Sequence, residues 1–103
     1  MKPILEPSAQ DFLAALSSDR DFAALSNHVL DEINYIASDP SVDGESKHLV
    51  DLPEANTFYH ILWGATNRGR QYWYIYEPDY DQDTVRVYNI GFVGTEKPFL
   101  SRR

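Results

Sequence analysis

The sequence contains no cysteine, a single methionine and only five glycines. The absence of cysteine excludes disulfide bonds and cysteine-ligated zinc sites, and it is typical of proteins in reducing compartments. Long hydrophobic runs are also missing, since the longest have about six residues and a membrane-spanning helix needs roughly 20. The first residues do not resemble a secretory signal, because Glu6, Pro7 and Asp11 interrupt any apolar stretch. The sequence therefore predicts a cytoplasmic protein without a membrane partner.

Positive charge is scarce in the first two thirds of the chain. Residues 1–63 contain three Lys/Arg and eleven Asp/Glu, which gives −8, and residues 64–103 contain six and five, which gives +1. Affinity for nucleic acids depends on neutralising phosphates, so a chain of net charge −7 is a poor general binder of RNA or DNA. Any such contact is expected from the last 40 residues. The acidic part suits a basic protein partner.

Aromatic and β-branched residues are abundant in the chain. With 43% hydrophobic and 14% aromatic residues in 103, the chain is expected to form one domain with one core, residues 1–103. Three runs of aromatic and β-branched residues, 58–63, 71–76 and 84–90, are separated by turn residues at Gly64–Gly69 and Pro78–Asp83. This pattern predicts a three-stranded antiparallel meander.

The residues before the meander predict an edge strand and a helical hairpin. Pro3–Glu6 is a short apolar run, and Ser8 is the expected N-cap of a first helix over residues 9–17. Ser18 repeats the capping signal, so a second helix is expected to start there and to end at Asp39-Pro40. Its apolar stripe comprises Phe22, Leu25, Val29, Ile33 and Ile36, and its polar face comprises Arg20, Asp21, Asp31, Glu32 and Asn34.

These elements predict an α+β fold in which the strand and hairpin pack on one face of a three- to four-stranded antiparallel sheet. Residues 41–56 are interpreted as a connecting loop with a turn of structure around His48–Val50, and residues 98–100 as a short final strand. Alternation along the middle strand separates Tyr72, Tyr74 and Tyr76 from Trp73 and Ile75. Because the hairpin covers one face, the other is expected to expose tyrosines to a partner.

In this order of elements the chain resembles the RelE/ParE superfamily of small bacterial toxins. Ile4–Leu16 resembles the opening strand and Leu-rich helix of that family, and Ala37–Pro40 resembles its Asp-Pro helix end. Tyr72–Tyr76 and Val85–Gly91 resemble its third and last strands. The resemblance covers most of the chain and implies the toxin of a type II toxin–antitoxin module, neutralised by an antitoxin protein.

The resemblance also implies candidate catalytic residues. The resemblance implies that ribosome-dependent ribonucleases of this family use basic residues on the second strand, an arginine on the third, and an arginine and a tyrosine after the last. The second-strand position corresponds here to His60, and the third-strand position corresponds to Arg70, or to Gln71 if the alignment is offset by one. Arg86 is a further candidate. A histidine serves readily as acid or base near neutral pH. Each residue also has a structural interpretation: His60 packed in the sheet, Arg70 solvated at a hairpin tip, and Arg86 paired with an acidic neighbour.

Three mechanisms follow as hypotheses. The chain is an mRNA-cleaving toxin acting on the ribosome, an inhibitor of DNA gyrase by protein contact, or a binding module that has kept the fold and lost the chemistry. Phe92-Val93 stands where the family carries a basic pair, which favours the last two. No cofactor or metal is implied, because the acidic run Asp79–Asp83 lacks the glycine and glutamate of a calcium loop and is interpreted as a solvated turn.

Overall fold

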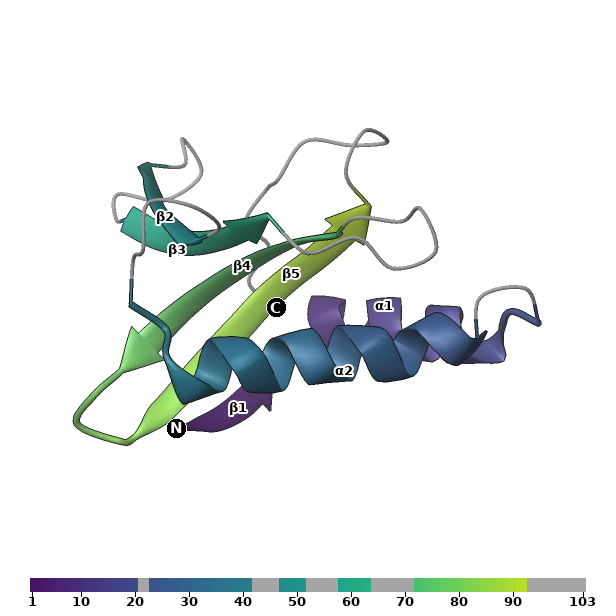
Figure 1. The fold of residues 1–103 in the computed structure, drawn as a ribbon, viewed down its shortest axis with the longest axis horizontal. Helices are drawn as coiled ribbons and strands as arrows, with labels where there is room; N and C mark the ends of the chain where they lie inside the picture. The colour runs from purple at the N-terminus through teal and green to yellow at the C-terminus, as the bar shows by residue number, and fades with distance from the viewer. Residues whose placement is uncertain (21–22, 42–46, 52–57, 64–71, 93–103) are drawn as a thin grey trace.

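The computed structural model describes residues 1–20, 23–41, 47–51, 58–63 and 72–92 (Figure 1). These residues form an α+β fold, as the sequence predicts. Neither of the helices within those ranges is long and apolar enough to cross a membrane. In chain order the elements are β1 (Lys2–Leu5), α1 (Pro7–Ser18), α2 (Ala23–Ser38), β2 (Lys47–Asp51), β3 (Phe58–Trp63), β4 (Tyr72–Asp79) and β5 (Thr84–Phe92).

The strands form one five-stranded sheet with the order β1-β5-β4-β3-β2. Strands β2 to β5 are an antiparallel meander, whereas β1 pairs with β5 in parallel, with Ile4 opposite Arg86. The prediction of an entirely antiparallel sheet of three to four strands is therefore wrong. The first and last strands become neighbours because the helical hairpin between β1 and the meander supplies the long crossover that parallel pairing requires.

The strand β2 lies inside the segment 41–56, where the sequence predicts a loop with a turn of structure around His48–Val50. The structure has a strand at this place, so the loop prediction is wrong there. It is a short, polar edge strand that pairs with β3. Short edge strands with charged residues are common because they discourage pairing with other chains. The predicted turn 64–69 and final strand 98–100 lie outside the described residues, as does Phe22.

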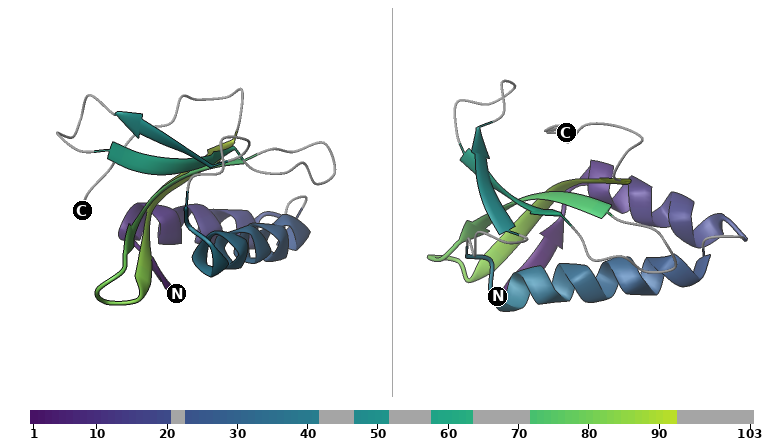
Figure 2. Two further views of the ribbon diagram at one scale, coloured as in Figure 1. Left: turned by 60° about the vertical axis from the view of Figure 1, so that its left-hand side comes forward. Right: turned by 45° about the horizontal axis from the view of Figure 1, so that its top comes forward.

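Both helices lie on the same side of the sheet (Figure 2). The helix α1 begins at Pro7 with Glu6 as its N-cap, rather than at residue 9 with Ser8 as the cap. A proline is well suited to the first helical position because its φ angle is already helical and the missing N–H would have no partner there. Ser18 is the last residue of α1 and does not start α2.

The core lies between the helices and the Tyr72–Tyr74–Tyr76 face of β4. These three tyrosines are 0% exposed and pack with the α2 stripe, so the prediction that tyrosines of the sheet remain exposed is wrong for this strand. On α2 the predicted stripe is confirmed at Leu25, Val29, Ile33 and Ile36. Trp73 and Ile75, on the other face of β4, are also fully buried, so the chain shields both faces of this strand.

The connection between β4 and β5 is shorter than predicted. Strand β4 continues through Pro78 to Asp79, and β5 begins at Thr84. The Asp79 carboxylate accepts hydrogen bonds from the backbone N–H groups of Asp81 and Gln82, at 3.1 and 3.2 Å. Asp83 has a φ angle of 55°, a left-handed conformation that aspartate tolerates better than most residues. The acidic run is thus a tight turn.

Candidate functional site

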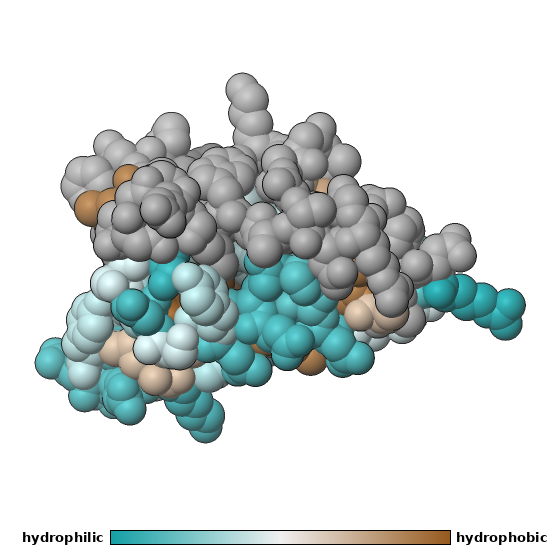
Figure 3. Space-filling view, in the orientation of Figure 1, coloured by the Kyte–Doolittle hydropathy of each residue, from teal (hydrophilic) through white to brown (hydrophobic). Residues whose placement is uncertain are grey.

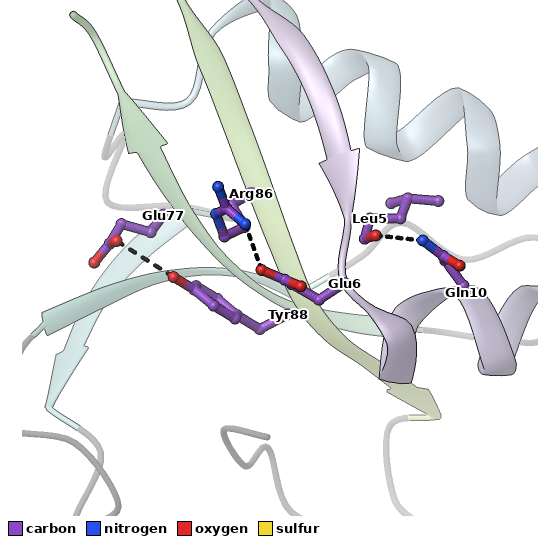
Figure 4. A network of polar contacts seen from close by, with 6 residues as sticks. All are labelled: Leu5, Glu6, Gln10, Glu77, Arg86 and Tyr88. Carbon is purple, nitrogen blue, oxygen red and sulfur yellow. Dashed lines mark hydrogen bonds and ion pairs between the residues drawn. The ribbon is translucent and has the colours of Figure 1, made fainter. Parts of the chain in front are cut away.

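Arg86 is the candidate site residue whose side chain the structure describes. It lies on β5, on the face that points away from the helices, and its side chain is 47% exposed. Its Nη1 donates a 2.6 Å hydrogen bond to Oε1 of Glu6, the residue between β1 and α1 (Figure 4). This bond raises the pKa of the Arg86 guanidinium. The predicted structural interpretation, a pair with an acidic neighbour, is confirmed.

Two further polar residues extend this group across the sheet. The register shift between β4 and β5 leaves Tyr88 as an extra residue beside Arg86, and its hydroxyl lies 3.4 Å from Oε1 of Glu77 on β4 (Figure 4). Burial, and then the charge of Glu77, raises the pKa of Tyr88 to about 12. We call Glu6, Glu77, Arg86 and Tyr88 the open-face group. It contains two carboxylates and one guanidinium, so it attracts cations at least as well as phosphates.

Of the other two candidates, the structure describes only the backbone of His60. His60 lies on β3, where its backbone pairs with Leu49 on one side and with Tyr76 on the other. Tyr76 in turn pairs with Val87, so by register His60 belongs to the helix-covered face and Arg86 to the opposite one. The side chain of His60 and the whole of Arg70 lie outside the described residues.

A buried polar cluster between α2 and β4 was missed by sequence analysis. Glu32, which was predicted to lie on the polar face of the helix, is only 7% exposed. Its Oε1 accepts a 2.8 Å hydrogen bond from the Tyr74 hydroxyl and lies 3.1 Å from Nε2 of His28. The side chain of His28 is 20% exposed. Burial, and then the charge of Glu32, raises the pKa of Tyr74 above its ordinary value.

A signal for this cluster exists in the sequence. His28 and Glu32 are four residues apart, a spacing that places two side chains next to each other on a helix. Leu25 and Val29 are buried, and Glu32 follows Val29 by three positions while Ile33 follows it by four. Both spacings place a residue on the same side of a helix as Val29. Spacing along the helix therefore allows either Glu32 or Ile33 to be the next buried residue. Glu32 faces inward as well because the Tyr74 hydroxyl on the sheet donates a hydrogen bond to it.

Two cations are used to stabilise the end of α2. The Nζ of Lys47, a residue that is almost fully buried, donates a hydrogen bond to the backbone oxygen of Asp39 and lies 4.5 Å from the centroid of the Tyr35 ring. The terminal amino group of Met1 donates a 3.1 Å bond to the backbone oxygen of Ala37. Positive charge at a helix C-terminus is favourable because the last carbonyl groups carry partial negative charge.

The remaining cations with described positions are dispersed. Lys2 is exposed on β1 opposite Thr84, two strand positions from the Ile4–Arg86 pair, and Arg20 is exposed after α1. A phosphoryl-transfer site needs several cations converging on the developing charge. Within the ranges that the structure covers, Arg86 is held by Glu6 and Lys47 by α2, and no such convergence occurs. Comparison with protein-family models, curated proteins and solved structures gives no match.

Proposed function

We propose that this chain is a RelE/ParE-like growth-inhibiting toxin that acts by binding a protein target and is neutralised by an antitoxin protein. Support for the toxin class comes from the sequence resemblance together with the order of elements: a strand, a helical hairpin and an antiparallel meander. Because a fold hosts many functions, the site has to decide between cleavage and contact.

The 2.6 Å bond between Arg86 and Glu6 is the observation that favours contact. An arginine that stabilises a transition state has to present its N–H groups to the developing negative charge. Here the nearest anion is the carboxylate of the same chain, so a phosphate would have to displace Glu6 or share the guanidinium with it. The Glu77 carboxylate on the same face adds repulsion toward a phosphate. Contact with a protein target does not require a phosphate to approach these carboxylates. DNA gyrase is one candidate target.

Regulated expression in a bacterial host tests this proposal. We expect growth arrest with intact transcripts, and we expect the arrest to persist in Arg86→Ala, because the guanidinium has no catalytic part in it. The matched variant Glu6→Gln removes the pairing carboxylate and leaves Arg86 in place. Growth arrest accompanied by cleaved transcripts that are lost in Arg86→Ala contradicts the contact mechanism, and unaffected growth at high expression contradicts the toxin class.

A further inference from the structure

The strand β1 forms one outer edge of the sheet. Among the described strands it is the first in the sheet order, and it pairs only with β5. The backbone N–H of Lys2 points toward β5, where it donates a 2.9 Å hydrogen bond to the backbone oxygen of Asp83. Main-chain groups alternate in direction along a strand, so those of Pro3 and Leu5 point away from β5. These two residues therefore determine which hydrogen bonds the edge can offer to a further strand.

Both of these residues limit the pairing of the edge. Pro3 has no backbone N–H, and proline in a sheet is confined to places such as edges, where that group would face away from the neighbouring strand. The backbone oxygen of Leu5 already accepts a 2.7 Å hydrogen bond from Nε2 of Gln10 on α1 (Figure 4). A further strand would therefore find no donor at Pro3 and an acceptor already in use at Leu5.

The first turn of α1 places Gln10 for this bond. The backbone N–H of Gln10 donates a 3.0 Å bond to the backbone oxygen of Glu6, and its side chain reaches one residue further back, to Leu5. Side chains of a helix lean toward its N-terminus, which favours this direction. Gln10 is exposed, and a neutral hydrogen bond in contact with water contributes only modestly to stability. The main consequence of the bond is thus that the Leu5 oxygen is occupied.

The surroundings of β1 give a partner strand little else to bind. Lys2 is exposed, and lysine and proline are common on edge strands because they hinder pairing with other chains. The helix α2 lies in front of β1 in Figure 1, and the surface along this helix in Figure 3 is mostly hydrophilic. The main chain of β1 is therefore the feature that would attract a further strand.

We infer that Pro3 and Gln10 close the β1 edge to the addition of a strand, and that the strand they exclude is β1 of a second copy of the chain. An unprotected edge is a template for pairing because its N–H and C=O groups form a row without partners. A two-fold axis at this edge would place two β1 strands side by side and antiparallel. The inference does not depend on the proposed function, which it only restricts: a protein partner that extends the sheet does not do so at β1.

The test opens the edge and measures self-association of the full chain by analytical ultracentrifugation. In Pro3→Val/Gln10→Ala, valine supplies a backbone N–H and suits a strand, and alanine releases the Leu5 oxygen while favouring the helix. We expect this double variant to self-associate at least about tenfold more tightly than the natural chain. With ¹⁵N-labelled protein, the resonance shifts that appear with rising concentration are expected at Lys2–Leu5.

A second double variant supplies the matched control. Pro3→Val/Gln82→Ala carries the same change at Pro3 but removes an exposed glutamine from the turn between β4 and β5, so Gln10 still occupies the Leu5 oxygen. We expect it to associate several-fold less tightly than Pro3→Val/Gln10→Ala. Urea unfolding shows that each variant is folded. If Pro3→Val/Gln10→Ala does not fold, Gln10→Ala alone is compared with Gln82→Ala and is expected to associate more tightly.

Three outcomes contradict the inference. The first is a folded Pro3→Val/Gln10→Ala variant that associates no more tightly than the natural chain. The second is equal association of the two double variants, because Gln10 would then have no part in closing the edge. The third is a set of resonance shifts confined to β2, which would place the contact at the opposite edge of the sheet.

Discussion

The hydrogen bond between Tyr74 and Glu32 allows a quantitative prediction about the stability of the fold. Tyr74 is fully buried, Glu32 nearly so, and the two oxygen atoms are 2.8 Å apart. A hydrogen bond to a charged group contributes about 1.5–3 kcal/mol, and removal of one partner weakens the solvation of the buried carboxylate. Tyr74→Phe is therefore expected to lower the free energy of unfolding by about 2 kcal/mol.

Tyr76 provides a control on the same strand and the same face. It is equally buried, but its hydroxyl donates to the neutral backbone oxygen of Pro40 at 3.1 Å. A neutral hydrogen bond contributes about 1 kcal/mol, so Tyr76→Phe should cost about half as much as Tyr74→Phe. Urea unfolding followed by circular dichroism measures both. The reasoning is refuted if the two variants lose the same stability.

A double-mutant cycle isolates the pair itself. In Glu32→Met the acceptor is replaced by an apolar side chain of similar length, and Tyr74→Phe then has no charged partner to leave behind. The double variant is expected to lose about 2 kcal/mol less free energy of unfolding than the sum of the losses in the two single variants. A coupling energy below about 0.5 kcal/mol contradicts the assigned interaction, because distant residues add within that limit.

The same pair predicts sensitivity to alkali. Because burial and Glu32 raise the pKa of Tyr74, the folded state retains the Tyr74 proton at a pH where the unfolded state loses it. This contribution is complete below pH 10, the ordinary pKa of tyrosine, and decreases as the pH rises further, by about 1.4 kcal/mol per pH unit. Tyr74→Phe should show a shallower loss of stability above pH 10. An unchanged slope contradicts the shift.

Three further predictions concern other contacts. Replacing Lys47, which bonds to the end of α2, with methionine is expected to cost about 1–2 kcal/mol in urea unfolding, whereas Lys2→Met should cost less than about 0.5 kcal/mol. Because Arg86 is half exposed, Arg86→Ala should cost no more than about 1 kcal/mol, and 1 M salt should reduce the difference. Absorbance titration should show a tyrosine with a pKa of about 12, which is absent in Tyr88→Phe, and this variant should lose less stability between pH 10 and 12.

Sequence patterns predicted most of the individual elements. The meander was visible because aromatic and β-branched residues are concentrated in 58–63, 71–76 and 84–90, and the end of α2 because Asp39 precedes a proline. Which strands pair with each other was harder to predict from the sequence. The parallel contact of β1 with β5 depends on how the helical hairpin crosses the sheet, which local spacing does not determine.

The same distinction applies to the polar residues. The structural interpretation of Arg86 could be formed from its place on a strand, but Glu6 is 80 residues away in sequence and could not be named as its partner. Glu32 was predicted to lie on the polar face of α2 because charged residues are usually exposed, and Lys47 is another exception to that rule. Each is buried where another element supplies a bonding group, Tyr74 for Glu32 and the end of α2 for Lys47.

An assay with purified ribosomes tests the contact mechanism most directly. The chain is added to ribosomes that carry a defined mRNA, and the 3′ ends of the RNA are mapped with and without the chain. The proposal predicts that no new 3′ ends form, even at saturating amounts of a chain that arrests growth. New ends that disappear when Arg86→Ala or Arg70→Ala replaces the natural chain would contradict it.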